Sequence, residues 1–400
     1  MTTPHAALLQ LVSSGEAGSV DDDETFLLSV HEHRMTAAVL LAHQQGRLSL
    51  PASVATTLSI WDLAERREHL RFWKAIEEVH RRLAPTGAEV AVLKGVATEA
   101  RWYDEPGQRI ATDVDLLLAP DVLDSAAELV AVIDPDRGMS ASIDWLVRRR
   151  LLQHVDLHVG PVQVDLHFDP LKIGIPTRQI AEVWTSTQLL PTPHGMIRVL
   201  RPEMELVLFL LHLNKDSFAY LGPFLDVRQI VERAELDWSY LAAFVAEEGL
   251  AVPVFKSLAV VANLLNLDVN VLRPTGVRAR TWDRLWGPRV RLRGDEGRLA
   301  APRAQRLLAF HASRRMRDVV LESSRQLLPP RQLLEVAGYL QPGGSYLRSL
   351  TVDRLRADDR RVPAMLGGSA EHVIDYGSGE GDRANRVSLD GGKGTWRKAR

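Results

Sequence analysis

The sequence of 400 residues contains no cysteine. Disulfide bonds, zinc sites built on thiolates and thiol nucleophiles are therefore excluded. The formal net charge is only −2, so no overall field of either sign favours nucleic acid or an anionic membrane as a partner. The most apolar stretch, residues 205–213, is too short to span a bilayer, and residues 1–20 lack a basic segment followed by an apolar core. We therefore expect a cytoplasmic protein with no membrane partner.

The residues that are present are typical of a soluble globular protein, with 46% apolar and 25% charged side chains. The length exceeds the size at which one hydrophobic core keeps growing, so two or three structural units are expected. Charge is uneven only locally. Residues 273–331 hold fifteen arginines against five acidic residues, which is either the solvated side of helices or a surface for a polyanion.

Hydrophobic periodicity divides the chain into regions. Residues 24–82 carry apolar side chains three and four positions apart, which predicts helices, and this spacing returns after Pro202. Between these stretches the pattern is that of strands and short helices, and the end of the chain is poor in apolar residues. We predict an N-terminal helical region at 1–85, an α/β core at 86–200, a C-terminal helical region at 201–345 and a mostly disordered tail at 346–400.

The core begins with a readable strand, helix and strand. Residues 89–93, a glutamate followed by four apolar residues, predict a short buried strand ending at Lys94-Gly95. A helix is expected from 97 to 102, and a second strand from 112 to 118. Together they predict one mixed α/β unit.

A β-hairpin follows in the sequence. Residues 152–159 and 162–168 flank Gly160-Pro161, a pair that suits a type II′ turn because only the first position needs a positive φ. With that turn, the numbers of opposed residues sum to 321. Asp156 should then face Asp165, and His154 should face His167, on one side of the hairpin.

Carboxylates gather in this core. Asp113 and Asp115 are two apart on the expected strand, so both leave the same face and could hold one or two cations, although this spacing also occurs by chance in turns. Opposed at about 5 Å, Asp156 and Asp165 would repel each other by about 3 kcal/mol at an effective dielectric near 20. A divalent cation, a raised pKa or the neighbouring histidines could compensate, or both side chains could extend into water.

Phosphoryl and nucleotidyl transfer need this kind of arrangement. Two metal ions about 3.5–4 Å apart neutralise the charge of the reacting phosphates, and three carboxylates from adjacent strands can bridge them. Lys94-Gly95, at a strand end that opens a helix, supplies a cation and a close backbone approach for a triphosphate.

Four segments together resemble a known family. They are Leu93-Lys94-Gly95, the pair Tyr103 and Arg109, Asp113-Val114-Asp115-Leu116-Leu117-Leu118, and Val164-Asp165-Leu166-His167. They are similar to the signature of the bacterial uncharacterised nucleotidyltransferases, which belong to the DNA polymerase β-like superfamily. His212, Asp226 and Trp238 resemble the family's later pattern, and the likeness covers roughly residues 25–345. It implies an α+β fold, with a mixed-sheet nucleotidyltransferase core between N-terminal and C-terminal helical regions.

The resemblance also implies roles for particular residues. Asp113 and Asp115 would be paired metal ligands and Asp165 the third, all three catalytic, with Mg²⁺ or Mn²⁺ as the cofactor. Gly95 stands where the superfamily has its phosphate-loop glycine. Active members usually carry Gly-Ser there, whereas Val96 follows Gly95 here, and Lys94 could substitute as a cation.

Four more residues are expected at the nucleotide. Arg109 would contact the triphosphate or form a structural ion pair. His167 would orient an acid, touch the substrate or pack against its strand partner. His212 and Lys215 lie near the end of an apolar helix, where they could line a nucleotide pocket or simply complement the helix dipole.

The function that follows is metal-dependent nucleotidyl transfer. A nucleoside monophosphate would move from a nucleoside triphosphate, ATP above others, to an unidentified acceptor hydroxyl, with release of pyrophosphate, and Asp165 would assist deprotonation of the acceptor. One alternative is a catalytically inactive nucleotide- or metabolite-binding protein on the same fold. The other is a nucleic-acid-binding scaffold that uses residues 273–331, although nucleic acid is not favoured as a partner.

Overall fold

The N-terminal part of the chain is helical, as its apolar spacing predicts. The computed structural model describes residues 4–15, 17–20, 23–109, 111–137, 141–171, 177–216, 218–269 and 274–286. Its first helices are α1 (Pro4–Ser14), α2 (Asp23–Glu32), α3 (Thr36–Gln44) and α4 (Ala52–Leu83). Pro51 immediately precedes α4, where the missing N–H costs no helical hydrogen bond.

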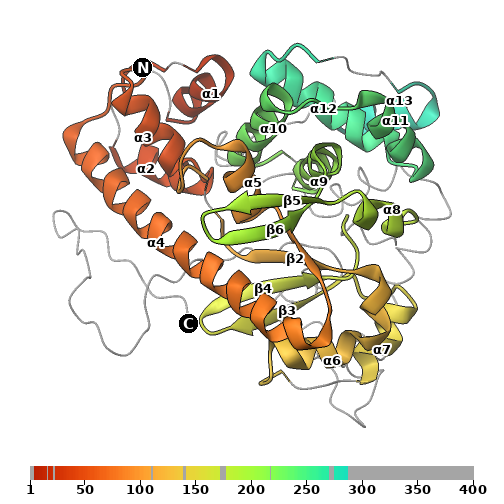
Figure 1. Ribbon diagram of the computed structural model, residues 1–400. Helices are drawn as coiled ribbons and strands as arrows, with labels where there is room; N and C mark the ends of the chain where they lie inside the picture. Colours follow the sequence, from red (N-terminus) through yellow and green to blue (C-terminus); the bar gives the residue numbers. More distant parts are fainter. Residues whose placement is uncertain are drawn as a thin grey trace, which may run out of the picture.

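Six strands form one mixed sheet, which lies between the helical regions in Figure 1. They are β1 (Val90–Leu93), β2 (Val114–Leu118), β3 (His154–Val159), β4 (Val162–His167), β5 (Gln188–Thr192) and β6 (Gly195–Val199). The order across the sheet is β3-β4-β2-β1-β6-β5. β2 pairs with β4, and β1 with β6, in parallel, while the other neighbours are antiparallel. The predicted α+β class with a mixed-sheet core is therefore confirmed.

Helices connect the strands and complete the C-terminal region. The connecting elements are η1 (Ala84–Thr86), α5 (Gly95–Trp102), η2 (Pro120–Ser125), α6 (Ala126–Ile133), α7 (Ala141–Arg148) and α8 (Ile180–Thr185). The C-terminal helices are α9 (Pro202–Lys215), α10 (Gly222–Arg233), α11 (Trp238–Glu247), α12 (Ala251–Leu265) and α13 (Val277–Trp286). No helix in the described ranges combines the length and apolar composition that crossing a membrane requires. The predicted tail at 346–400 lies outside the described residues, as does all but 274–286 of the arginine-rich segment.

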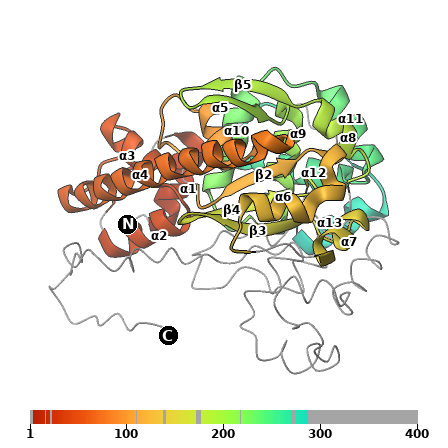
Figure 2. The same ribbon diagram turned by 60° about the horizontal axis from the view of Figure 1, so that its bottom comes forward.

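The sheet has two different faces. Because side chains alternate along a strand, Val114, Leu116 and Leu118 of β2 share one face. They pack into a buried core with residues of α4, α6 and α7, and Figure 2 shows α4 and α6 lying on the same side of the sheet. Leu117 instead joins a second core that contains α9 and the N-terminal helices. Asp115, two residues before Leu117, therefore belongs to the face that α9 approaches.

Helix α4 connects the two cores. Val54 and Leu58, in its first half, are buried with the N-terminal helices. Phe72, Ile76 and Val79, in its second half, are buried against the sheet. The helical region expected at 1–85 is thus continuous with the core through this one helix.

The β3/β4 hairpin has the predicted register. Asp156 pairs with Asp165, and His154 pairs with His167. Gly160 has a φ of 60°, the positive value that the first position of the expected turn requires. The turn therefore determines which polar side chains meet on this hairpin.

Glu65 on α4 is a half-buried acid. Burial raises the pKa of Glu65 to about 7, the hydrogen bond from Thr36 lowers it and the nearby Asp62 carboxylate raises it. Thr36 Oγ1 donates to Glu65 Oε1 over 2.9 Å. Because the folded state holds this proton more tightly than the unfolded chain, this group's contribution to stability falls as the pH rises from about 4.5 to about 7.

We predict that Glu65→Gln stabilises the protein at pH 8 and has little effect at pH 5. Glutamine keeps the acceptor for Thr36 but cannot ionise, so the gain at pH 8 is at most about 3 kcal/mol, set by the pKa difference. Denaturant unfolding at both pH values measures it. Glu68→Gln, which removes an exposed acid paired with Arg71 on the same helix, is the control and should show no such pH dependence. An equal gain for Glu65→Gln at both pH values would contradict the titration.

Candidate active site

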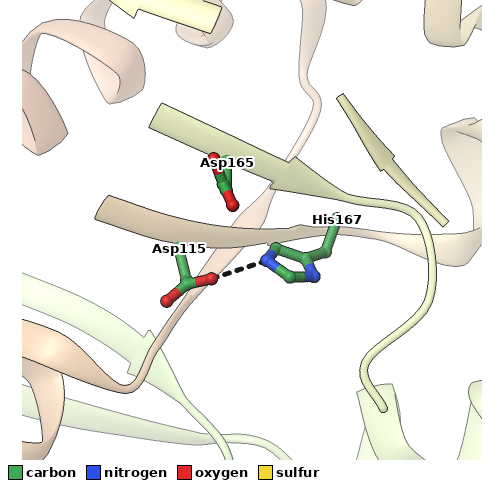
Figure 3. A group of neighbouring side chains, drawn as sticks. All are labelled: Asp115, Asp165 and His167. Atoms are coloured by element: carbon green, nitrogen blue, oxygen red, sulfur yellow. Dashed lines mark hydrogen bonds and ion pairs between the residues drawn. The ribbon is translucent and has the colours of Figure 1, made fainter. Parts of the chain in front are cut away.

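Two buried carboxylates lie side by side at the centre of the sheet. Asp115 of β2 pairs in register with Asp165 of β4, and these parallel strands place both side chains on the face toward α9. They are only 6% and 5% exposed. Figure 3 shows the two carboxylates extending from neighbouring strands beside the ring of His167. Such closely packed, desolvated acids need positive charge or hydrogen-bond donors around them.

His167 contacts the acid of the neighbouring strand. Its Nε2 lies 2.7 Å from Asp115 Oδ1, and the ring is 1% exposed. The ring also stacks on His154 of β3, with centroids 5.7 Å apart. His167 therefore contacts both an acid on the neighbouring strand and the ring of its strand partner. Gln163 adds a donor, because its Nε2 lies 3.1 Å from Asp165 Oδ1.

Two groups of ligand atoms on this face are close enough to share an ion. Asp115, Asp165 and His167 each offer an atom within 4.8 Å of the others, and so do His154, Asp156 and Asp165. Asp165 belongs to both groups. Carboxylate oxygens suit Mg²⁺ and Mn²⁺, whereas imidazole nitrogen is a better ligand for Mn²⁺ and later transition metals than for Mg²⁺.

Lys94 extends from the end of β1 to the acids. Its Nζ lies 3.3 Å from Asp115 Oδ2 and 3.2 Å from His212 Nε2 of α9. The ammonium group can donate to both when His212 is neutral and carries its lone pair on Nε2. Lys94 also has a φ of 37°, which is strained for a residue with a side chain. The backbone conformation at Lys94 thus places a cation beside Asp115.

Gly95 and Asp113 meet at the first turn of α5. Gly95 has a φ of 49°, and a Cβ at this position would lie 3.6 Å from the carbonyl oxygen of Asp113. The strand expected from residue 112 begins at Val114, so Asp113 stands immediately before β2. It is half-buried, and its Oδ1 accepts a hydrogen bond from Thr112 over 3.2 Å. Asp113 is in neither of the two ligand groups found among the described residues.

Arg109 forms an ion pair inside the protein. Its Nε lies 2.8 Å from Asp226 Oδ1 of α10, and its guanidinium lies over the ring of Phe209. Burial lowers the pKa of Arg109, but the charge and hydrogen bond of Asp226, together with Tyr103 and Glu99, raise it above its usual value. Tyr103 donates its hydroxyl to the same Asp226 oxygen over 2.8 Å. Burial, followed by that carboxylate, raises the pKa of Tyr103 well above its ordinary value.

His212 and Lys215 lie in the last turn of α9. Their spacing of three places them on neighbouring positions of the helix surface. His212 is joined to the acid pair through Lys94. Lys215 is the last residue of the helix, and its place at the nucleotide stays a prediction.

Sequence reasoning gave no site role to two buried acids that organise this region. Asp226 is 2% exposed and lies beside the buried Phe224, Val227 and Ile230 on α10. Glu99 is 3% exposed on α5 and pairs with His69 of α4 over 2.6 Å. The family pattern names Asp226 without a role, and its place among the core positions of a helix is the signal that it needs a partner, because a charge is buried only with one.

Comparison with known proteins assigns the family. A search of curated proteins finds no match. The crystal structure of an antigenic nucleotidyltransferase-like protein from Paracoccidioides brasiliensis is similar over 50% of this chain and 93% of that chain, with 14% identity and a TM-score of 0.30. The family model described as "Uncharacterised nucleotidyltransferase" matches residues 19–266, which include the sheet, Lys94, His212 and the acids described above. The chain therefore belongs to the uncharacterised nucleotidyltransferase family.

Proposed function

We propose that this protein transfers a nucleoside monophosphate from a nucleoside triphosphate, ATP above others, to an acceptor hydroxyl and releases pyrophosphate. The observation that carries the proposal is the buried, in-register pair of Asp115 and Asp165, with the Lys94 ammonium beside it. Family membership supports the reaction class. Nucleotidyl transfer requires such charge at one point, because the reacting phosphates are anionic and the chemistry is mainly positioning and charge neutralisation.

The donor atoms fit a divalent cation. Asp115 and Asp165 offer carboxylate oxygens, His167 offers an imidazole nitrogen, and these atoms lie within 4.8 Å of one another. We assign Asp113, immediately before β2, and Asp115 as the paired ligands and Asp165 as the third. A bound Mg²⁺ or Mn²⁺ would neutralise the triphosphate and align its reacting oxygens.

The protein's own groups would position the reactants. The first turn of α5, with Gly95 at its start, presents backbone N–H groups and a positive dipole end to a phosphate. Lys94 would turn from Asp115 toward the phosphates, and His212 and Lys215 would line the α9 side of the nucleotide. His167 would keep the Asp115 carboxylate oriented through its 2.7 Å contact.

In the reaction, the acceptor oxygen forms a bond to the α-phosphorus. The bond from that phosphorus to the oxygen bridging to the β-phosphate breaks, and pyrophosphate leaves with the electron pair. We assign to Asp165 the task of assisting removal of the acceptor proton. Arg109 enters the proposal indirectly, because its guanidinium is held by Asp226.

A second candidate function is nucleotide or metabolite binding without turnover. The observation that favours it is the contact of Lys94 with Asp115, which gives a carboxylate expected to bind metal a cation from the protein itself. Val96, where active superfamily members have a serine, favours it as well. Binding of a nucleoside triphosphate with no release of pyrophosphate, over a panel of hydroxyl acceptors, would support this function over the first.

We predict that Mg²⁺ or Mn²⁺ with ATP raises the melting temperature. By mass action the stabilisation is about 2.7 kcal/mol when the ligand concentration is about 100 times Kd. Replacing both Asp113 and Asp115 by asparagine should abolish this shift, and calorimetric titration measures the binding directly. The matched control replaces the exposed Asp121 and Asp124, which follow the same strand, by asparagine. Equal binding by the Asp113/Asp115 variant and the parent would show that the site is elsewhere.

We also predict that Asp165→Asn lowers turnover on the order of 10²-fold, by analogy with the loss of one group that stabilises a transition state. Asp156→Asn, on the opposed position of β3, should cost much less. It should leave the fold as stable or slightly more stable, because it relieves a pair of like charges. Pyrophosphate release and melting curves for both variants test this. The reverse result, with Asp156→Asn inactive and Asp165→Asn nearly unchanged, would move the third ligand to β3.

A further inference from the structure

We infer that Asp226 of α10 is a positioning residue for the metal site, acting through the chain segment that leads into Asp113. The inference rests on the proposed function, because it takes Asp113 and Asp115 as metal ligands. Asp226 makes no contact with these acids among the interactions described above. Its partners are Tyr103 and Arg109, which both lie between α5 and β2.

The described residues between α5 and β2, 103–109 and 111–113, lie along α5. The segment leaves the end of α5 at Trp102, and Ala111 and Asp113 return to the first turn of that helix. A Cβ on Gly95 would lie 3.6 Å from both Ala111 Cβ and the Asp113 carbonyl. The segment therefore sets how Asp113 stands against Lys94-Gly95. Any change in its path would move Asp113 relative to the acids on the sheet.

The middle of this segment is attached to α5. Glu99 Oε1 accepts hydrogen bonds from the backbone N–H groups of Gly107 and Arg109, over 2.7 and 3.0 Å. Arg66 of α4 donates to the carbonyl of Pro106. These contacts hold residues 106–109 against the core through the backbone.

The other attachment comes from the C-terminal helical region. A single oxygen, Asp226 Oδ1, accepts from Tyr103 Oη and Arg109 Nε, each over 2.8 Å. Asp226 is 2% exposed, so both contacts lie in a low-dielectric interior. One carboxylate on α10 therefore holds both Tyr103, directly after α5, and Arg109, four positions before Asp113. Helix α10 is thereby attached to residues that precede β2, the strand that carries Asp115.

A second ion pair also joins α10 to the segment between α5 and β2, and it can be compared with the contacts of Asp226. Arg233 of α10 forms a two-pronged pair with Asp104, at 2.7 and 2.8 Å. These side chains are 40% and 72% exposed, so water and salt screen the pair. Distance alone would rank the two contacts as equal. Burial separates them, because loss of the Asp226 charge leaves the Arg109 cation in the interior without its partner.

The experiment uses the full chain, with Mn²⁺ and α,β-methylene-ATP as the probe. For Asp226→Asn, we expect Mn²⁺ affinity per folded molecule to fall about tenfold, which corresponds to about 1.4 kcal/mol. Hydrogen exchange should accelerate in peptides covering 103–113 and stay unchanged in peptides covering β1 and β4. Arg233→Gln should match the parent in both measurements. Where turnover is measurable, kcat should fall while KM for the nucleotide changes little, because Lys94 and His212 are untouched.

A second variant keeps the inference testable if Asp226→Asn unfolds. Combining Arg109→Met with Asp226→Asn removes both charges, so the melting temperature should recover while Mn²⁺ affinity stays low. Recovery of Mn²⁺ affinity to the parent value would overturn the inference, since Asp226 would then serve stability alone. Uniformly faster exchange along the chain, with unchanged Mn²⁺ affinity, would overturn it equally.

Failure of the proposed function is seen separately, in the parent protein. If the parent binds neither Mn²⁺ nor the analogue, the metal site itself is wrong, whatever the variants do. If the parent binds both and Asp226→Asn behaves like Arg233→Gln, the metal site is supported and the positioning role of Asp226 is contradicted.

Discussion

The burial of two neighbouring carboxylates is the constraint around which the site is organised. Asp115 and Asp165 are paired in register on parallel strands and almost excluded from water. Two such charges repel each other strongly unless donors or cations surround them. The structure supplies Lys94 and His167 to Asp115, and Gln163 to Asp165. A divalent cation would satisfy the same charge, and this is why we propose these acids as metal ligands.

Apolar packing elsewhere on the sheet offsets the free-energy cost of burying these two carboxylates. On the opposite face, Val114, Leu116 and their neighbours pack against α4 and α6 in one continuous core. Because α4 also belongs to the core of the N-terminal helices, it joins the sheet to the rest of the protein. The strands are thereby held rigidly, and small movements of one strand relative to the next are resisted by close packing. A polar face of this kind needs such support, since its own interactions are sensitive to geometry.

The same rule, that a buried acid requires defined partners, recurs outside the sheet. Glu99 accepts hydrogen bonds from two backbone N–H groups and pairs with a histidine. Asp226 accepts hydrogen bonds from a tyrosine and an arginine. Glu205 of α9 takes the indole N–H of Trp102 and the hydroxyl of Thr98, while burial raises the pKa of Glu205. Each acid joins α5 or the segment after it to another helix. Buried carboxylates therefore connect the phosphate-binding turn proposed at Lys94-Gly95 to the N-terminal and C-terminal regions alike.

Local sequence features were enough to predict part of this structure. The Gly160-Pro161 turn and the two-residue period of a strand were enough to pair Asp156 with Asp165, because a hairpin register depends only on the turn. The motif at Lys94-Gly95 and the acids at 113, 115 and 165 carried the family resemblance. Contacts between distant residues could not be read this way. Lys94 meets His212 across 118 positions, and Arg109 meets Asp226 across 117. No periodicity encodes such a pairing, so the ion pair of Arg109 with Asp226 depends on how α10 packs against the segment between α5 and β2.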